Sequence, residues 1–287
     1  MKGKNIEKVL VTGGAGFIGS HVVDLLIEKD YEVKILDNLE PQVHGIEGKL
    51  PSYLNENVTL ITGDTRNRED LVKSLEDVDA VIHLAAAVGV GQSMYQISKY
   101  VSYNTLGTAN LLDVVVNERN NVKKIIVASS MSIYGEGKYY CERCGYVYPK
   151  LRDEEQLNKK EWEPKCPICK HEITPVPTDE DKPLNPTSIY AQTKRHQEEM
   201  VLLIGRTYGI PSVALRFFNV YGPRQSLRNP YTGVAAIFLS RLLNNKPPYV
   251  FEDGNQTRDF VHVKDIAQAV VLALEKSSAN YLPLNVG

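Results

Sequence analysis

The sequence has no long hydrophobic run and almost no net charge. None of its apolar stretches approaches the roughly 20 residues that a membrane-spanning helix needs, and its start shows no signal-peptide pattern. Lys and Arg number 33 against 35 Asp and Glu, which leaves a formal charge of −2. A balanced charge gives no electrostatic reason to expect nucleic acid or an anionic membrane as a partner. We therefore expect a cytoplasmic protein with neither of these partners.

Cysteine and tryptophan are scarce, and both occur in one stretch. The single tryptophan is Trp162. The cysteines form two Cys-x-x-Cys pairs and are Cys141, Cys144, Cys166 and Cys169. In a reducing compartment this spacing favours a metal over disulfides, and four thiolates are typical of a closed, structural zinc site. Iron could also fit such a set, and unligated or reactive thiols are the alternative. Nearby His171 could replace one ligand, although four cysteines already suffice.

Short apolar runs alternate with longer segments of helical period, which is the pattern of βαβ units. Predicted strands cover Lys8–Val11, Val33–Asp37, Val58–Asp64, Ala80–Ala85, Lys124–Ser129 and Val213–Phe218. Predicted helices cover Phe17–Lys29, about Tyr95–Asn117, Ser188–Tyr208, Val234–Leu243 and Asp265–Glu275. Continuous apolar strands suit a parallel sheet that is covered on both faces. The pattern predicts an α/β fold with a doubly wound, Rossmann-type parallel sheet.

A glycine motif follows the first predicted strand. Gly14-x-Gly16-x-x-Gly19, preceded by Gly13, lies between that strand and a predicted helix. Glycines let a pyrophosphate approach the backbone, and the helix N-terminus supplies unpaired N–H groups. Asp37 ends the second strand, where a carboxylate can bond the adenosine ribose hydroxyls and would repel a 2′-phosphate. The motif therefore predicts a dinucleotide site that prefers NAD to NADP.

Two further positions near this motif bear on the cofactor. No arginine follows Asp37 directly, since the next residue is Asn38. Asp64 ends the third predicted strand and could face the adenine edge, although aspartates at strand ends are common.

A tyrosine and a lysine recur at helical spacing later in the chain. Tyr190 and Lys194 are four residues apart, so both project from one face of a helix. A nearby ammonium favours the phenolate form of tyrosine, and the pair can act as an acid/base catalyst. Ser129 and Ser130 end the fifth predicted strand. A serine there can hydrogen-bond the substrate oxygen that Tyr190 deprotonates.

Motifs along nearly the whole chain, apart from the cysteine stretch, fit one family. They are Thr12–Gly19, His83–Ala86, Asn104-x-x-Gly107-Thr108, Ser129-Ser130 with Tyr134-Gly135, Tyr190-x-x-x-Lys194, Arg216–Pro223 and Arg258–Val263. Together they resemble the extended short-chain dehydrogenases, which are the nucleotide-sugar epimerases and dehydratases. The resemblance implies an NAD-binding Rossmann domain over residues 1–212, interrupted by the four-cysteine metal-binding insertion at 136–177. It implies that residues 213–287 mainly bind a nucleoside-diphosphate sugar, with return helices to the Rossmann core.

The resemblance also implies roles for individual residues. Tyr190 would be the catalytic base, Lys194 would orient the cofactor ribose, and Ser130 would be the second hydroxyl on the sugar. Asn219 and Arg258 would contact the diphosphate region of the substrate, and arginine suits phosphate geometry. Residues that would contact NAD, besides Tyr190 and Lys194, are Gly13, Gly16, Phe17, Ile18, Asp37, Asn38, Asp64, Thr65, Leu84, Ala85, Ala86 and Asn104. Members of the family usually form homodimers.

The residues after Ser130 separate the reactions of the family. Family dehydratases carry an Asp-Glu pair there, and this chain has Met131 and Ser132. Neither side chain can act as a carboxylic acid, which counts against dehydration and predicts a 4-epimerase with a transient 4-keto intermediate. With the cysteine pairs, the chain resembles a subgroup similar to dTDP-L-rhamnose 4-epimerases, and UDP-glucose/galactose is the other substrate considered. A 4,6-dehydratase, a dehydrogenase, a decarboxylase and a catalytically silent NAD-binding protein with a zinc docking module stay open.

The insertion lies in the chain between Ser130 and Tyr190, so we expect it beside the mouth of the active site. It would cover the sugar pocket or contact a partner. The sequence ends at Gly287, just after an apparent strand, and we expect the natural protein to continue.

Overall fold

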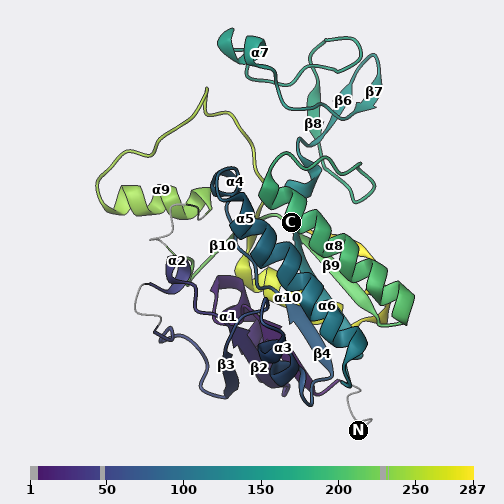
Figure 1. Ribbon diagram of the computed structural model, residues 1–287. Helices are drawn as coiled ribbons and strands as arrows, with labels where there is room; N and C mark the ends of the chain where they lie inside the picture. The colour runs from purple at the N-terminus through teal and green to yellow at the C-terminus, as the bar shows by residue number, and fades with distance from the viewer. Residues whose placement is uncertain (1–5, 46–48, 227–230, 232) are drawn as a thin grey trace.

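A computed structural model describes residues 6–45, 49–226, 231 and 233–287. In this described part of the chain, seven strands form a parallel sheet in the order β12-β9-β5-β4-β1-β2-β3. Among them, Figure 1 labels β2, β3, β4 and β9. The strands are β1 (Lys8–Thr12), β2 (Glu32–Asp37), β3 (Val58–Thr62), β4 (Ala80–His83), β5 (Lys124–Ser130), β9 (Ser212–Phe217) and β12 (Pro283–Val286). The predicted Rossmann-type sheet is confirmed, and the strand order reverses between β1 and β4, where such sheets bind ligands.

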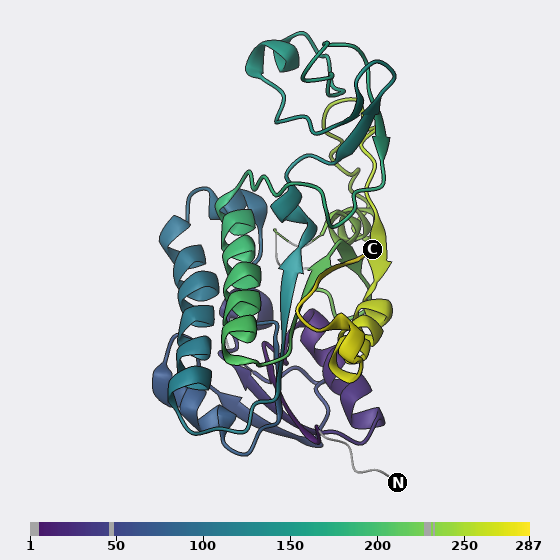
Figure 2. The same cartoon turned by 90° about the vertical axis from the view of Figure 1, so that its right-hand side faces the viewer.

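Helices cover both faces of the sheet, as Figure 2 shows. Helices α1 (Phe17–Glu28) and α10 (Val263–Glu275) pack on one face. Helices α3 (Arg68–Leu75), α6 (Gly107–Asn117) and α8 (Ile189–Tyr208) pack on the other. Successive residues of one strand face opposite layers, so in β5 Ile126 belongs to the first apolar cluster and Ile125 to the second. This two-sided burial is why the strands read as continuous apolar runs.

The helix predicted near Tyr95–Asn117 is built from three consecutive pieces. They are α5 (Ile97–Tyr100), a π-helical turn η1 (Val101–Leu106) and α6. The hydrophobic pattern did not reveal the change of period, because one wide turn moves the apolar face only locally. Such π turns often mark functional sites, and this one contains Asn104.

The hydrophobic pattern of the sequence did not predict several short elements. They are α2 (Pro41–His44), α4 (Val90–Ser93) and the 3-10 turns η2 (Met131–Tyr134) and η3 (Ser277–Ala279). Each has only three or four residues, which is too few for a hydrophobic period to appear.

The cysteine stretch, all of whose residues are described, forms a small unit of its own. Strands β6 (Lys138–Cys141), β7 (Gly145–Val147) and β8 (Thr174–Val176) pair antiparallel in the order β7-β6-β8, and α7 (Glu154–Asn158) lies between β7 and β8 in the chain. Figures 1 and 2 show this unit projecting from the end of the main sheet at which β5 finishes.

The chain after residue 212 is shared between the main sheet and a peripheral part. Strands β9 and β12 and helix α10 belong to the sheet and its cover. Strands β10 (Asn219–Tyr221) and β11 (Phe260–His262) form a separate parallel pair, and helix α9 (Val234–Leu243) precedes β11. The domain division at residue 212 stays a prediction, and residues 1–5, 46–48, 227–230 and 232 of the predicted domains lie outside the described residues. No helix in the described ranges is long and apolar enough to cross a membrane.

Candidate active site

A cavity of about 480 Å³ opens at the carboxyl ends of the central strands. Fifteen of the residues expected to bind cofactor or substrate line it: Gly13, Gly16, Phe17, Ile18, Asp37, Asn38, Asp64, Thr65, Leu84, Ala85, Ala86, Ser130, Tyr190, Lys194 and Asn219. Asn104 and Arg258 are not among the lining residues. Segments that are far apart in sequence thus meet at the crevice where open α/β sheets bind ligands.

Gly13, in the loop after β1, and Gly19, in the first turn of α1, have no room for a Cβ. Gly13 has a left-handed φ of +72°, and a Cβ there would lie 2.9 Å from the backbone nitrogen of Ala85. A Cβ on Gly19 would lie 2.2 Å from the carbonyl oxygen of Gly13. Without side chains at these positions, a dinucleotide pyrophosphate can come close to the backbone N–H groups at the start of α1. These residues therefore fit NAD.

Asp37 ties this loop to the end of β2. The backbone N–H of Ala15 donates to Asp37 Oδ2 at 3.0 Å, and that of Leu39 donates to Oδ1 at 2.9 Å. The side chain is buried yet still lines the cavity. Its two backbone bonds hold the carboxylate rigidly where it can accept bonds from ribose hydroxyls.

Asp64 lies farther along the same wall, held by two neighbours. The Arg66 guanidinium bonds both of its oxygens, with Nη2 to Oδ2 at 2.6 Å, and Asn38 Nδ2 donates to Oδ2 at 3.0 Å. Burial tends to raise the pKa of Asp64, but the bonds from Arg66 and Asn38 outweigh it and lower the pKa overall. Arg66, which the sequence reasoning missed, is thus a cation already paired with Asp64.

Ser130, Tyr190 and Lys194 converge on the cavity from two elements. Ser130 ends β5, while Tyr190 and Lys194 lie one turn apart at the start of α8. Ser188 caps this helix, its Oγ accepting the N–H of Ala191 at 3.1 Å. The cap fixes the first turn, which carries Tyr190.

The pKa values at this point are set by burial and by one hydrogen bond. Burial raises the pKa of Tyr190, and the bond from the Ser130 side chain lowers it. Burial lowers the pKa of Lys194 to about 7, and its Nζ donates to the carbonyl oxygen of Ala128 at 2.9 Å. The amine is therefore only partly charged at neutral pH. The pKa of Tyr190 is raised overall, because the effect of burial exceeds that of the bond with Ser130.

A buried polar group beneath the cavity was not foreseen as such. His83, at the end of β4, contacts Thr12 Oγ1 through Nδ1 at 2.7 Å and Thr108 Oγ1 through Nε2 at 2.9 Å. Burial lowers the pKa of His83 to about 3, and the Lys194 charge acts in the same direction. His83 is accordingly neutral and links β1, β4 and α6 below the reacting groups.

A buried ion pair holds the catalytic helix against the turn after Ser130. Arg216 of β9 bonds Glu198 of α8, with Nη2 to Oε1 at 2.6 Å, and its Nη1 donates to the hydroxyl oxygen of Tyr134 at 2.6 Å. Both charged side chains are buried. The sequence motif contained Arg216 and Tyr134, but their joining to Glu198 needs the tertiary structure.

Asn104, Asn219 and Arg258 each bond a backbone carbonyl, and of the three only Asn219 lines the cavity. Asn104 is fully buried, and its amide bonds both the N–H and the carbonyl of Ala87 and also Thr193 Oγ1. Asn219 Nδ2 donates to the carbonyl of Asp259 at 3.0 Å. Arg258 is exposed, and its Nη1 donates to the carbonyl of Thr257 at 2.6 Å. In this conformation Asn104 and Arg258 do not reach the cavity.

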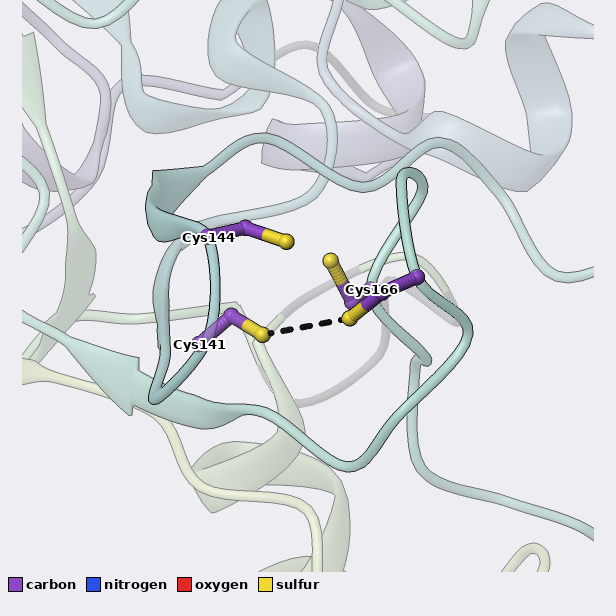
Figure 3. A group of neighbouring side chains, drawn as sticks. Cys141, Cys144 and Cys166 are labelled. Carbon is purple, nitrogen blue, oxygen red and sulfur yellow. Dashed lines mark hydrogen bonds between the residues drawn. The ribbon is translucent and has the colours of Figure 1, made fainter.

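The four cysteines of the insertion form a second candidate site. Their sulfur atoms all lie within 4.8 Å of one another, and those of Cys141 and Cys169 are 3.6 Å apart. Figure 3 shows the side chains of Cys141, Cys144 and Cys166 turned toward a common centre. Tetrahedral zinc with Zn–S bonds of about 2.3 Å places its sulfurs roughly 3.8 Å apart. The donor set and its spacing therefore fit one metal ion.

A parallel sheet with a glycine loop after β1 and a Ser, Tyr and Lys group at one cavity defines a dinucleotide-binding enzyme of the short-chain dehydrogenase class. The family model described as "NAD dependent epimerase/dehydratase family" matches residues 9–160 and 169–287. The chain belongs to this family, which confirms the resemblance inferred from its motifs.

Similar proteins include nucleotide-sugar 4-epimerases. A dTDP-L-rhamnose 4-epimerase of Burkholderia thailandensis is 37% identical over 94% of this chain and 73% of its own length. A putative UDP-glucose 4-epimerase of Methanocaldococcus jannaschii is 37% identical over 93% of this chain and 73% of its own length. Among solved structures, the UDP-N-acetylglucosamine 4-epimerase of Methanobrevibacter ruminantium, in complex with UDP-N-acetylmuramic acid, is 35% identical with a TM-score of 0.76. That alignment covers 98% of this chain and 76% of the other.

Proposed function

We propose that this protein catalyses the NAD-dependent 4-epimerisation of a nucleoside-diphosphate sugar, a reaction of the isomerase class. The observation that carries the proposal is the meeting of Ser130, Tyr190 and Lys194 at the cavity that the glycine loop also lines. The similar proteins named as 4-epimerases support the same reaction. dTDP-L-rhamnose and UDP-glucose/galactose are the substrates we propose to test first.

The chain's own groups would act as follows. NAD⁺, held by the glycine loop and Asp37, would supply the acceptor for a hydride from the sugar carbon and then the source of the same hydride. Tyr190 takes the proton of the sugar 4-hydroxyl, and the Ser130 hydroxyl holds the same oxygen. Tyr190 then gives the proton back when the other face of the 4-keto sugar is reduced. Lys194 orients the cofactor ribose from one turn farther along α8.

Met131 and Ser132 support epimerisation over dehydration. Both line the cavity directly after Ser130. A dehydratase needs an additional acid and base to remove water, and neither a thioether nor an alcohol has a suitable pKa at neutral pH. The 4-keto intermediate is therefore left to turn and be reduced again.

The substrate would extend from Ser130 toward the peripheral segments. We propose that Asn219 contacts the diphosphate region, and that Arg258 pairs with the diphosphate after moving from its present exposed position. We likewise propose that residues 213–287 mainly serve substrate binding, with α10 and the strands β9 and β12 returning to the Rossmann core.

The four cysteines are proposed to hold a structural zinc ion. Cys141, Cys144, Cys166 and Cys169 would supply all of its ligands, so no position remains open for catalysis. Cys-x-x-Cys pairs that bind a metal are typical of a reducing compartment, so we also propose a cytoplasmic location.

A homodimer is proposed from apolar side chains on neighbouring helices. Ile97 of α5, Val101 and Leu106 of η1 and Leu203 of α8 are all exposed, and η1 contacts both α5 and α8. An exposed group of this kind is typical of a protein interface, and sedimentation of the wild-type protein tests it.

NMR in D₂O with a panel of thymidine- and uridine-diphosphate sugars tests the proposed reaction. We expect inversion at C4 without deuterium in the sugar. The variant Tyr190→Phe lacks the proton acceptor and should lower kcat by about 10³-fold. We expect this variant still to bind NAD. Solvent deuterium together with loss of water would instead mean a dehydratase. Bound NAD without conversion of any sugar would mean a binding protein.

A further inference from the structure

Ser132 has a contact with Ser130 that the proposed reaction does not yet use. Ser130 ends β5 and caps the turn η2, its Oγ accepting the backbone N–H of Ser132 at 3.2 Å. The Ser132 hydroxyl donates to the same oxygen at 2.9 Å. Two donors from one residue therefore converge on Ser130 Oγ.

These two bonds limit what the Ser130 hydroxyl can do. A serine hydroxyl carries two acceptor lone pairs and one proton. Both lone pairs of the Ser130 oxygen accept bonds from Ser132. Only the hydroxyl proton is then left for another hydrogen bond, so toward any other group Ser130 acts as a donor. A hydroxyl that donates to a phenol oxygen favours the phenolate. This agrees with the effect of Ser130 on Tyr190, which opposes the rise in the Tyr190 pKa that burial causes. The two bonds from Ser132 thus give the geometric reason for Ser130 to donate toward Tyr190.

We propose that Ser132 is a positioning residue that fixes the Ser130 hydroxyl as a hydrogen-bond donor toward Tyr190. The inference rests on the proposed function for its use in catalysis. A fixed donor stabilises the phenolate before reaction and afterwards holds the oxygen of the sugar. Family dehydratases carry a carboxylate at the position of Ser132. In this chain the residue at that position instead orients the hydroxyl of Ser130.

Other groups around Tyr190 act on it independently of Ser132. Lys194 lies one turn along α8, and the Tyr100 ring of α5 meets the Tyr190 ring edge-on at 6.4 Å. Other titratable or charged groups that line the cavity are Asp37, Glu40, His44, Asp64, Lys99, Tyr103 and Tyr231. Among the described residues, the hydrogen bonds of Ser132 go to Ser130 and Gly135 and to none of these groups. A shift in the Tyr190 titration in a Ser132 variant therefore reports the Ser130 bond.

The test measures the ionisation of Tyr190 directly in the NAD-loaded protein. Tyrosines carrying ¹³C at the ring carbon that bears the oxygen are titrated by NMR, and Tyr190→Phe identifies its signal among 16 tyrosines. Ser132→Ala should raise the Tyr190 pKa by about 0.5 to 1 unit, since one orienting bond is lost. Ser132→Thr keeps the hydroxyl and should restore the wild-type value. Ser74→Ala, a buried serine of α3 outside the cavity, is the matched control.

The outcomes separate this inference from the proposed function. An unchanged Tyr190 pKa in Ser132→Ala, or a threonine variant that behaves like alanine, would overturn the positioning role. A shifted pKa with no sugar epimerised by the wild type would support the bond polarity and reject the reaction. Where sugar is converted, the acid limb of the kcat profile should move to higher pH with the same variants.

Discussion

The main sheet and the cysteine insertion are stabilised in different ways. Among the described residues, the sheet is enclosed by two large apolar clusters, which hold fully buried side chains such as Ile35, Ile82, Leu111 and Ile125. In the insertion, the buried cluster consists of Cys141, Val147 and Cys166. Two of these three are predicted metal ligands.

The difference shows where the free energy of each fold comes from. Burying many branched side chains on two faces of a sheet stabilises the main body without help. A unit with one buried valine and three short strands buries too little apolar surface to offset its chain entropy. If the four cysteines hold the proposed zinc, the bonds to that metal would supply the missing stability. The two regions should then respond differently to metal, pH and salt.

The largest expected effect is the loss of the insertion's structure when the proposed zinc is removed. Structural zinc contributes about 10 kcal/mol or more to the folding of small zinc units. Cys141→Ser, or a strong chelator, should therefore abolish protection of the amides of β6 and β7 in hydrogen exchange. The amides of β1 and β5 should stay protected, and NAD binding should persist.

A matched change in the main body should give the reverse result. Ile126→Ala leaves a cavity in a buried strand and should lower the free energy of unfolding of the sheet by about 2–5 kcal/mol, with metal content unchanged. If chelation also lowered the unfolding temperature of the sheet substantially, the two regions would be one cooperative unit.

A smaller effect should follow from acidification, and it should arise in the main body. The pKa of His83 is about 3 in the fold against an ordinary value of 6.5, so the unfolded chain takes up the proton more readily. Its contribution to stability is full above pH 6.5 and is lost as the pH falls toward 3. Between pH 6.5 and 4.5 the loss amounts to about 2 kcal/mol.

The variant His83→Gln removes this titration while keeping polar contacts to Thr12 and Thr108. Urea unfolding at several pH values should show a flatter acid dependence for this variant than for the wild type. His196→Gln, at a half-buried position of α8 whose ring contacts Thr105 and Gln192, serves as the control. Equal acid slopes in wild type and His83→Gln would show that His83 does not control this loss.

The smallest expected effect concerns an ion pair that joins the insertion to the segment before β11. Arg152 Nη1 and Nη2 bond the two carboxylate oxygens of Glu252 at 2.9 and 3.0 Å, and Nη1 also bonds the carbonyl of Trp162. Arg152→Met should increase amide exchange around residue 252 by about two- to fivefold, and less at high salt. Glu252→Gln should behave alike, and the double variant should add little. If the effects of the two single variants on amide exchange added up in the double variant, the ion pair would not connect the insertion to this segment.

Much of the fold and site followed from local sequence because the chemistry there depends on spacing along the chain. The glycine loop needs bare backbone at Gly13 and Gly19, and Tyr190 and Lys194 share a helix face through their separation of four. The Cys-x-x-Cys spacing likewise predicts that the two sulfurs of each pair lie close enough to bind one metal ion. The short turns could not be predicted, since three or four residues show no period.

By itself, then, the sequence determined the parallel α/β sheet, the placing of the glycine loop and the identities of Ser130, Tyr190 and Lys194. The tertiary structure alone decided what those groups experience. It buried His83 and Lys194, which lowers both pKa values through desolvation. It also filled both lone pairs of Ser130 from Ser132 and left Arg258 outside the cavity. Burial and bond direction arise only when distant segments pack together, and no pattern along a single chain contains them.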